Sequence, residues 1–215
     1  MRLLEIPTEI SKYAEMHSGT EDPLLEELHR QTHLKTVHPQ MISGPLQGAL
    51  LQMISTMVRP HRILEIGTFT GYATICLSRG LAEGGKMTTI EVNDEVEEIC
   101  RKYFEKAGIA DRIDLVIGNA LEMVPQLRET FDLVFIDGNK EHYPRYYAQC
   151  LEKTRPGGYL LIDNVLWGGK VIGESLGKDR SAQIIDLLNK DIHNDPRVEN
   201  VLVPVRDGLM VVRKK

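Results

Sequence analysis

The sequence lacks a long hydrophobic run and has no signal-peptide core near its N-terminus. No apolar stretch approaches the ~20 residues that a membrane-spanning helix requires, which argues against an integral membrane protein. Residues 1–19 are interrupted by Glu5, Pro7, Glu9 and Lys12, so they cannot form the apolar core of a secretory signal. We therefore expect a cytoplasmic protein without a membrane partner.

Basic residues are outnumbered by acidic ones, and cysteines are few. The chain has 26 lysines and arginines against 31 aspartates and glutamates, and its net charge is −5. This balance gives no general attraction to nucleic acid or to anionic membranes, although a local basic patch stays open. The three cysteines, Cys76, Cys100 and Cys150, have neither a paired disulfide pattern nor a zinc spacing. We expect reduced thiols on buried helix faces.

A length of 215 residues is enough for one domain with a sizeable core. We predict a single domain over 1–215, because no linker, repeat or low-complexity segment divides the chain. Within it we expect N-terminal helices over 1–58 and an α/β core over 59–215. In the first part, Asp22 and Pro23 are typical of the start of a helix. After Pro60, short β-type runs alternate with amphipathic stretches, at 62–67, 72–81, 86–91, 94–108, 112–118, 120–127, 131–137, 143–154 and 158–163.

This alternation predicts a doubly wound, mostly parallel sheet with helices on both faces. The continuous apolar strands agree, because central parallel strands are buried on both sides. A helix near 180–193 follows, and then two β-type runs joined through Arg206, Asp207 and Gly208. The short Asp-Gly connection predicts a C-terminal antiparallel hairpin.

The turn after the first predicted strand, LEIGTFTGYAT at 64–74, is rich in glycine. Gly67 and Gly71 permit a tight turn and a close backbone approach. The G-x-G-x-x-G pattern of dinucleotide binders fails here, since Phe69 and Tyr72 occupy its later glycine positions. Glu65, just before the turn, would repel a pyrophosphate and attract an amine-bearing ligand.

The second predicted strand ends in Glu91, and an acid at this tip commonly binds the two hydroxyls of a ribose. Taken alone, the glycines are ordinary turn residues, and Glu65 and Glu91 are ordinary solvated strand ends. Together, on successive strands, the two acids favour S-adenosylmethionine over NAD as the cofactor.

Charged residues also follow two later strands. Asp137 ends the apolar run 133–136, with Lys140 three positions on, and Asp163 and Asn164 end the next strand. Taken singly, each is an ordinary loop residue. The carboxyl ends of parallel strands meet at one edge of a sheet, so we expect these side chains to converge.

With these motifs, the chain resembles the metal-dependent class I O-methyltransferases that include catechol and caffeoyl-CoA O-methyltransferases and small bacterial relatives. The resemblance covers nearly the whole chain. The matching segments are MISGPLQGALLQ (41–52), LEIGTFTGYAT (64–74), TIEVNDE (89–95), DLVFIDGNKEHY (132–143), LIDNVLWGG (161–169) and PVRDGLMVVRK (204–214). The resemblance implies a Rossmann-like fold with a seven-stranded sheet.

The resemblance also implies roles for individual residues. It assigns contacts with S-adenosylmethionine to Met41, Ser43, Glu65, Gly67, Phe69, Ala73, Glu91, Val92, Asn119, Ala120 and Asp137. Within that set, Glu65 would face the amino end of the cofactor, Glu91 its ribose and Asn119 its adenine. The implied metal ligands are Asp137, Asp163 and Asn164, the implied catalytic base is Lys140, and Trp167 and Asp207 would lie by the acceptor.

The implied chemistry is methyl transfer to a catechol-like phenol. Two carboxylates and an amide oxygen suit a hard cation such as Mg²⁺, with Ca²⁺ or Mn²⁺ as substitutes. A homodimer with residues 1–40 at its interface is implied too. The chain departs from the family pattern at Asn119, where many bacterial relatives have Asp, at Ala73, where some have Ser, and at Pro39, where mammalian catechol enzymes have Trp.

Several alternatives remain at this point. Some bacterial relatives methylate 5-hydroxyuridine in tRNA, and a local basic groove would suffice for that substrate. A cofactor-binding protein without catalysis is a second alternative, which the intact set of Asp137, Lys140, Asp163 and Asn164 argues against. A dehydrogenase is the weakest, given the failed glycine pattern. Trp167 is equally well explained as a wall of the acceptor site or as a packing residue.

Overall fold

The fold is organised by a seven-stranded sheet. The structure, a computed structural model, describes residues 8–19 and 21–215. The strands are β1 (Arg62–Ile66), β2 (Lys86–Glu91), β3 (Ile113–Ile117), β4 (Phe131–Ile136), β5 (Thr154–Asp163), β6 (Val198–Val203) and β7 (Leu209–Lys214). Their order is β3-β2-β1-β4-β5-β7-β6. Strands β1 to β5 are parallel, and β7 is antiparallel to both β5 and β6. The predicted doubly wound sheet with a C-terminal hairpin is confirmed.

Eight α-helices lie in the described part of the chain. They are α1 (Thr8–Met16), α2 (Pro23–Lys35), α3 (Gly44–Val58), α4 (Tyr72–Ser78), α5 (Glu97–Lys106), α6 (Ala120–Gln126), α7 (Tyr143–Lys153) and α8 (Arg180–Asn194). Short 3₁₀ turns are η1 (Pro39–Met41), η2 (Asp94–Val96), η3 (Ala110–Arg112), η4 (Lys140–His142), η5 (Trp167–Gly169) and η6 (Gly173–Lys178). Residues 1–7 and 20 of the predicted N-terminal helical region (1–58) lie outside the described residues.

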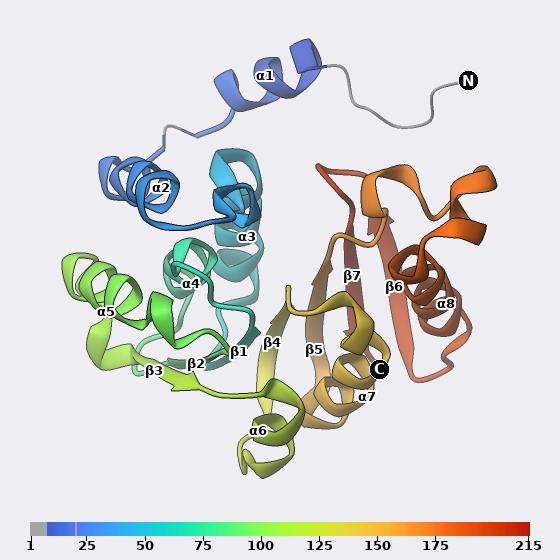
Figure 1. The fold of residues 1–215 in the computed structure, drawn as a ribbon. Helices are drawn as coiled ribbons and strands as arrows, with labels where there is room; N and C mark the ends of the chain where they lie inside the picture. The colour runs from blue at the N-terminus through green and yellow to red at the C-terminus, as the bar shows by residue number, and fades with distance from the viewer. Residues whose placement is uncertain (1–7, 20) are drawn as a thin grey trace.

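The central strands are apolar on both sides because helices cover both faces of the sheet (Figure 1). Leu64, Val134 and Leu160 belong to the buried cluster that contains residues of α6, α7 and α8. Their neighbours along the strands, such as Ile63 and Leu161, belong to the cluster with α2, α3, α4 and α5. The strands alternate between these two cores, as the period of two in a β-strand requires.

Local capping explains where two helices begin. Asp22 accepts a 2.7 Å hydrogen bond from the backbone nitrogen of Leu24 and caps α2, with Pro23 in the first helical position, as predicted. Asp179 caps α8 in the same way through the backbone nitrogen of Ala182. Helix α8 therefore starts at 180, and the prediction of a helix near 180–193 is confirmed.

The clearest boundary difference is at β5, which begins at Thr154 and not at the predicted 158. Thr154 pairs with Phe131, and the register then shifts before Leu133 pairs with Tyr159. The additional strand residues, 154–157, include no large apolar residue. They therefore lack the apolar run by which a buried strand is recognised in a sequence, and this pairing could not be predicted. The thiols of Cys76, Cys100 and Cys150 are free and buried on helices, as expected.

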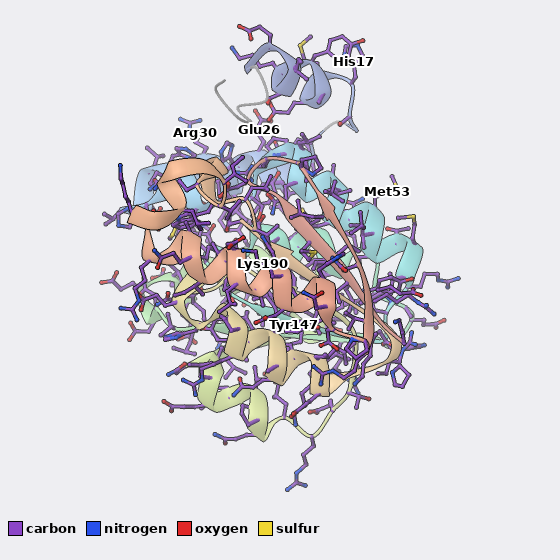
Figure 2. The ribbon with its side chains drawn as sticks, turned by 90° about the vertical axis from the view of Figure 1, so that its right-hand side faces the viewer. His17, Glu26, Arg30, Met53, Tyr147 and Lys190 are labelled. Atoms are coloured by element: carbon purple, nitrogen blue, oxygen red, sulfur yellow. The ribbon has the colours of Figure 1, made fainter. Side chains whose placement is uncertain are left out.

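Helix α1 lies at the edge of the molecule. Figure 2 shows this helix, which the labelled His17 directly follows, standing off from the body of the fold. Its apolar residues Ile10, Tyr13 and Met16 are largely exposed. None of the helices that the structure describes combines the length and the apolar character of a membrane-spanning segment.

Candidate active site

A cavity of about 760 Å³ opens at the carboxyl ends of the strands, beside the point where the strand order reverses between β1 and β4. This is the position where open α/β sheets bind their ligands. The predicted site residues that line it are Met41, Gly67, Phe69, Glu91, Val92, Asn119, Ala120, Asp137, Lys140, Asp163, Asn164 and Trp167. Ser43 and Ala73 line a small adjoining cavity together with Met41, Gly67 and Phe69.

Gly67 joins three strand ends at the floor of this cavity. Its φ of 95° lies in the region that favours glycine. A β-carbon at this position would stand only 2.2 Å from the carbonyl oxygen of Asp137. The Gly67 nitrogen donates to Ile90, and the Asp137 nitrogen donates to Ile66. Only glycine allows β1, β2 and β4 to end this close together.

Glu65 is buried beneath the glycine turn and does not line the large cavity. Its Oε2 accepts hydrogen bonds from the hydroxyls of Thr74 and Thr89. Its Oε1 is buried without a partner among the described residues. Burial raises the pKa of this carboxyl to about 8, although the two threonine hydrogen bonds oppose the shift. An unpartnered acceptor here fits a ligand that brings a hydrogen-bond donor such as an ammonium group.

Glu91 ends β2 and faces the cavity with a carboxylate that also shapes the turn. Its Oε2 accepts a 2.7 Å hydrogen bond from the backbone nitrogen of Phe69, and its Oε1 accepts one of 2.9 Å from Asn93. These two bonds fix the carboxylate in one orientation. A rigid acceptor at the tip of the second strand fits the paired hydroxyls of a ribose.

Asn119 follows β3 and caps helix α6. Its Oδ1 accepts a 3.0 Å hydrogen bond from the backbone nitrogen of Leu121, and its Nδ2 donates to Glu122 at 3.2 Å. The side chain of Asn119 is therefore already engaged in capping. Asn119 and Ala120 line the cavity beside Glu91.

Asp137 and Lys140 form a close pair at the tip of β4. Lys140 Nζ donates to Asp137 Oδ1 at 2.7 Å and to the hydroxyl of Tyr143 at 2.8 Å. That hydroxyl in turn donates to the backbone carbonyl of Asp163 at 3.1 Å. Complete burial is the main cause that holds the pKa of Tyr143 well above its usual range, and the negative charge of the nearby carboxylates adds to it. Tyr143 thus stays a neutral bridge between the ends of β4 and β5.

Asp163 is almost fully buried at the end of β5. Its Oδ2 accepts a 2.7 Å hydrogen bond from Gln47 Nε2, and its Oδ1 accepts one of 2.8 Å from the backbone nitrogen of Asn164. Burial, and then repulsion from Asp137, raise the pKa of Asp163 to about 7. The next residue, Asn164, has a φ of 58°, a strained conformation that turns the chain at the cavity.

Asp137, Asp163 and Asn164 fit a hard divalent cation. The donors are two carboxylates and one amide oxygen, which is the chemistry that Mg²⁺ prefers. Asp163 is desolvated and repelled by Asp137, and a cation would relieve both costs. No cluster of three His, Cys, Asp or Glu with metal-binding geometry occurs in the described part of the chain. The set therefore depends on its amide member.

The loop after β5 closes one side of the cavity. Trp167 lines the cavity with a φ of 49°, and its indole nitrogen donates to Asp179 at 3.3 Å. Asp207 lies outside the lining, and its carboxylate accepts a hydrogen bond from the backbone nitrogen of Gly168. Trp167 thus forms a wall of the cavity and also packs against the buried cluster that contains residues of α6, α7 and α8, while Asp207 holds the loop through Gly168.

Reasoning from the sequence missed three residues of this site, namely Gln47, Tyr143 and Arg206. Gln47 is buried on the face of α3 that also buries Leu51 and Ser55. A large polar side chain in register with Leu51 on a buried helix face is a signal that could have identified it. Tyr143 and Arg206 carry no comparable signal, because their roles depend on contacts with distant segments.

The family model described as O-methyltransferase matches residues 15–215 of the chain. Among similar proteins, caffeoyl-CoA O-methyltransferase 1 of Eucalyptus globulus is 32% identical over 184 residues, covering 81% of this chain and 75% of that protein. The catechol O-methyltransferase of Mycobacterium tuberculosis is 37% identical over 145 residues, covering 67% of this chain and 66% of that protein. The solved O-methyltransferase from Bacillus cereus, in complex with SAH, superposes with a TM-score of 0.87 at 31% identity and covers 96% of this chain and 97% of its own.

Proposed function

The chain belongs to the O-methyltransferase family as an enzyme that depends on S-adenosylmethionine, and from that premise we propose its acceptor class, its metal and its catalytic residues. The proposed acceptor is a small phenol with two neighbouring hydroxyls, and the proposed metal is Mg²⁺. One observation carries the proposal. Asp137, Lys140, Asp163 and Asn164 line the same cavity as Gly67 and Glu91.

S-adenosylmethionine would occupy the part of this cavity between the glycine turn and α6. Glu91 would accept hydrogen bonds from the ribose, because its carboxylate is held by Phe69 and Asn93 and faces the cavity. Glu65 would take the amino group, since its Oε1 is buried without a partner in the described part of the chain. The remaining predicted contacts are proposed for Met41, Ser43, Phe69, Ala73, Val92, Asn119, Ala120 and Asp137.

The acceptor would sit where β4 and β5 end. Asp137, Asp163 and Asn164 would hold the divalent cation. When bound, such a cation supplies positive charge that favours the oxyanion of a chelated hydroxyl and fixes the orientation of the ring. Trp167 would form one wall for the ring. Alignment of the acceptor with the methyl donor is the main requirement of methyl transfer, so this rigid setting supports the proposal.

Lys140 would take the proton of the acceptor hydroxyl at its Nζ. The Nζ of Lys140, which would act as the neutral amine, is held between Asp137 and Tyr143, directly beside a proposed metal ligand. Its side chain is only 15% exposed, so bulk water is largely excluded from the proton-transfer position. A positioned base of this kind typically contributes about 10² to 10⁴ in rate.

We also propose a cytoplasmic homodimer. The exposed apolar residues of the N-terminal region, including Ile10, Tyr13, Met16, Leu34 and Val37, support an interface within the predicted range 1–40. Such residues are costly to leave in water unless a second surface covers them. The mass of the purified protein in solution tests this assembly.

No observation favours the alternative acceptor, tRNA. The names of the proteins compared above are caffeoyl-CoA O-methyltransferase, catechol O-methyltransferase and O-methyltransferase, and none of them mentions tRNA. The net charge of −5 gives no general affinity for nucleic acid. The tRNA hypothesis therefore serves as one arm of the test.

The test is a methyl-transfer screen with catechols, flavonoid diols and hypomodified tRNA, each with Mg²⁺ and with EDTA. We expect transfer to vicinal diols, loss of transfer with EDTA and recovery on addition of Mg²⁺. The matched control is the monomethoxy derivative of each diol, which cannot chelate through two hydroxyls. Transfer that resists EDTA contradicts the metal, and transfer to tRNA alone contradicts the proposed acceptor class.

A further inference from the structure

Arg206 is a cationic residue of the cavity wall to which the proposed mechanism gives no role. It lies in the turn between β6 and β7, lines the large cavity and remains exposed at its rim. Its φ of 48° is costly for a residue with a side chain, and glycine or asparagine would adopt it more easily. The turn thus accepts backbone strain while it presents a guanidinium to the cavity.

Within the part of the chain that the structure describes, the guanidinium is held by neutral acceptors only. Its Nη1 donates to the side-chain oxygen of Gln47 at 3.1 Å, and both Nη atoms donate to the carbonyl of Ile42 at 3.3 Å. Arginines elsewhere, such as Arg155 and Arg197, pair with carboxylates. No described carboxylate pairs with Arg206.

The carboxylate next in sequence is directed elsewhere. Asp207 accepts a hydrogen bond from the backbone nitrogen of Gly168, in the loop after β5. Among the ion pairs of the described residues, none joins Asp207 to Arg206. The positive charge of Arg206 is therefore oriented by hydrogen bonds and not neutralised by an ion pair in the described residues. An arginine that is held in one orientation but is not paired with a carboxylate can bind an anionic group of a ligand.

The position of Arg206 relative to the proposed metal ligands defines what this anion could be. Gln47 bonds Arg206 through its Oε1 and Asp163 through its Nε2, so a single side-chain amide separates the guanidinium from the carboxylate. Asp163 and Arg206 line the same cavity. If the two hydroxyls of an acceptor chelate the proposed cation beside Asp163, the rest of the acceptor, its ring and its side chain, lies in the cavity that Arg206 lines. The planar fork of an arginine matches a carboxylate in two hydrogen bonds.

We propose that Arg206 binds a carboxylate on the methyl acceptor, so that the enzyme prefers acidic catechols to neutral ones of the same shape. This inference rests on the proposed function. It assigns the acceptor a second charged group at the end of the molecule opposite its hydroxyls. Arg206 would act on acceptor binding and would not take part in proton or methyl transfer.

The experiment compares acids with their own carboxamides, which differ in charge but hardly in shape. The acceptors are 3,4-dihydroxybenzoate, 3,4-dihydroxyphenylacetate and 3,4-dihydroxycinnamate, each beside its amide. We expect kcat/KM to favour the acid by about tenfold in at least one pair, as a charge-assisted hydrogen bond allows. In Arg206→Gln the ratio falls to about one, while turnover of the amide is retained and shows that the site is intact.

Arg213→Gln is the matched control, because it removes the same charge from the same hairpin, where Arg213 pairs with Glu199. This variant keeps the wild-type ratio. The inference is overturned if Arg206→Gln keeps the acid preference, lowers acid and amide by the same factor, or changes only the KM for S-adenosylmethionine. Absence of transfer to every catechol contradicts the proposed function instead, and with it this inference.

Discussion

The side-chain nitrogen of Gln47 donates a 2.7 Å hydrogen bond to Oδ2 of Asp163, although 116 positions separate the two residues. Gln47 lies on α3 and Asp163 at the end of β5. On its other side, the same amide accepts a 3.1 Å hydrogen bond from Arg206 Nη1 at its Oε1. A proposed metal ligand is thus held by a helix that precedes the whole sheet.

Gln47→Leu removes this donor at nearly constant volume. Because partners of metal ligands typically contribute 10- to 100-fold to metal affinity, we expect Mn²⁺ to bind about 10-fold or more weakly. The measurement is Mn²⁺ titration of the free enzyme by electron paramagnetic resonance, which requires no turnover. Gln52→Leu, on the same helix but with its side chain engaged by Arg79 outside the cavity, is the control. Equal Mn²⁺ affinity of the Gln47 and Gln52 variants would contradict the positioning role.

Lys140→Ala removes the proposed base and leaves the remaining cavity lining in place. We expect kcat to fall by about 100-fold or more, while SAH binds with nearly unchanged affinity. Single-turnover kinetics and calorimetric titration with SAH provide the two measurements. Lys190→Ala is the control, because Lys190 forms a similar local ion pair with Asp186 on the exposed side of α8. Full activity of the Lys140 variant would refute the assignment of the base.

Gly67→Ala would force a β-carbon to within 2.2 Å of the Asp137 carbonyl oxygen. Gly84→Ala is a matched control, because Gly84 also has a positive φ but a β-carbon there would meet nothing within 4 Å. We expect the control to lose about 1 kcal/mol from its backbone conformation, and Gly67→Ala to lose a further ~1–3 kcal/mol from the clash. Chemical denaturation measures both, and equal losses would show that the strand ends separate without cost.

Glu65 should make the stability of the cofactor-free protein depend on pH. Its folded pKa is raised from 4.5 to about 8, so the folded state binds more protons than the unfolded state between these values. Stability therefore falls as pH rises through this window and levels off above it. Glu65→Gln, which mimics the neutral form, removes this decline and raises the melting temperature more at pH 8 than at pH 5.

The control for this prediction is Glu83→Gln, an exposed residue between α4 and β2. It should leave the pH dependence unchanged. If Glu65→Gln and the wild type lose stability in parallel between pH 5 and pH 8, the charge of Glu65 is not the cause of the decline.

Much of the fold was predictable from the sequence, and the reason is local. The apolar runs that become β1, β4 and β5 and the alternating amphipathic stretches specify a parallel sheet, because each pattern reflects burial on one or both faces. The boundaries were less predictable. The early start of β5 depends on the pairing of Thr154 with Phe131, which is a contact between distant segments.

The candidate site, like the fold, was predictable from the sequence only in part. The sequence alone determined that Asp137 and Asp163 stand at the ends of neighbouring strands, since parallel strands carry their carboxyl ends to one edge. Only the tertiary structure decided that Gln47 binds Asp163, that Tyr143 bridges Lys140 to the end of β5, and that Arg206 enters the cavity without a carboxylate partner among the described residues. Hydrogen bonds between side chains on separate elements leave no periodic trace in a sequence, because they depend on how those elements pack together.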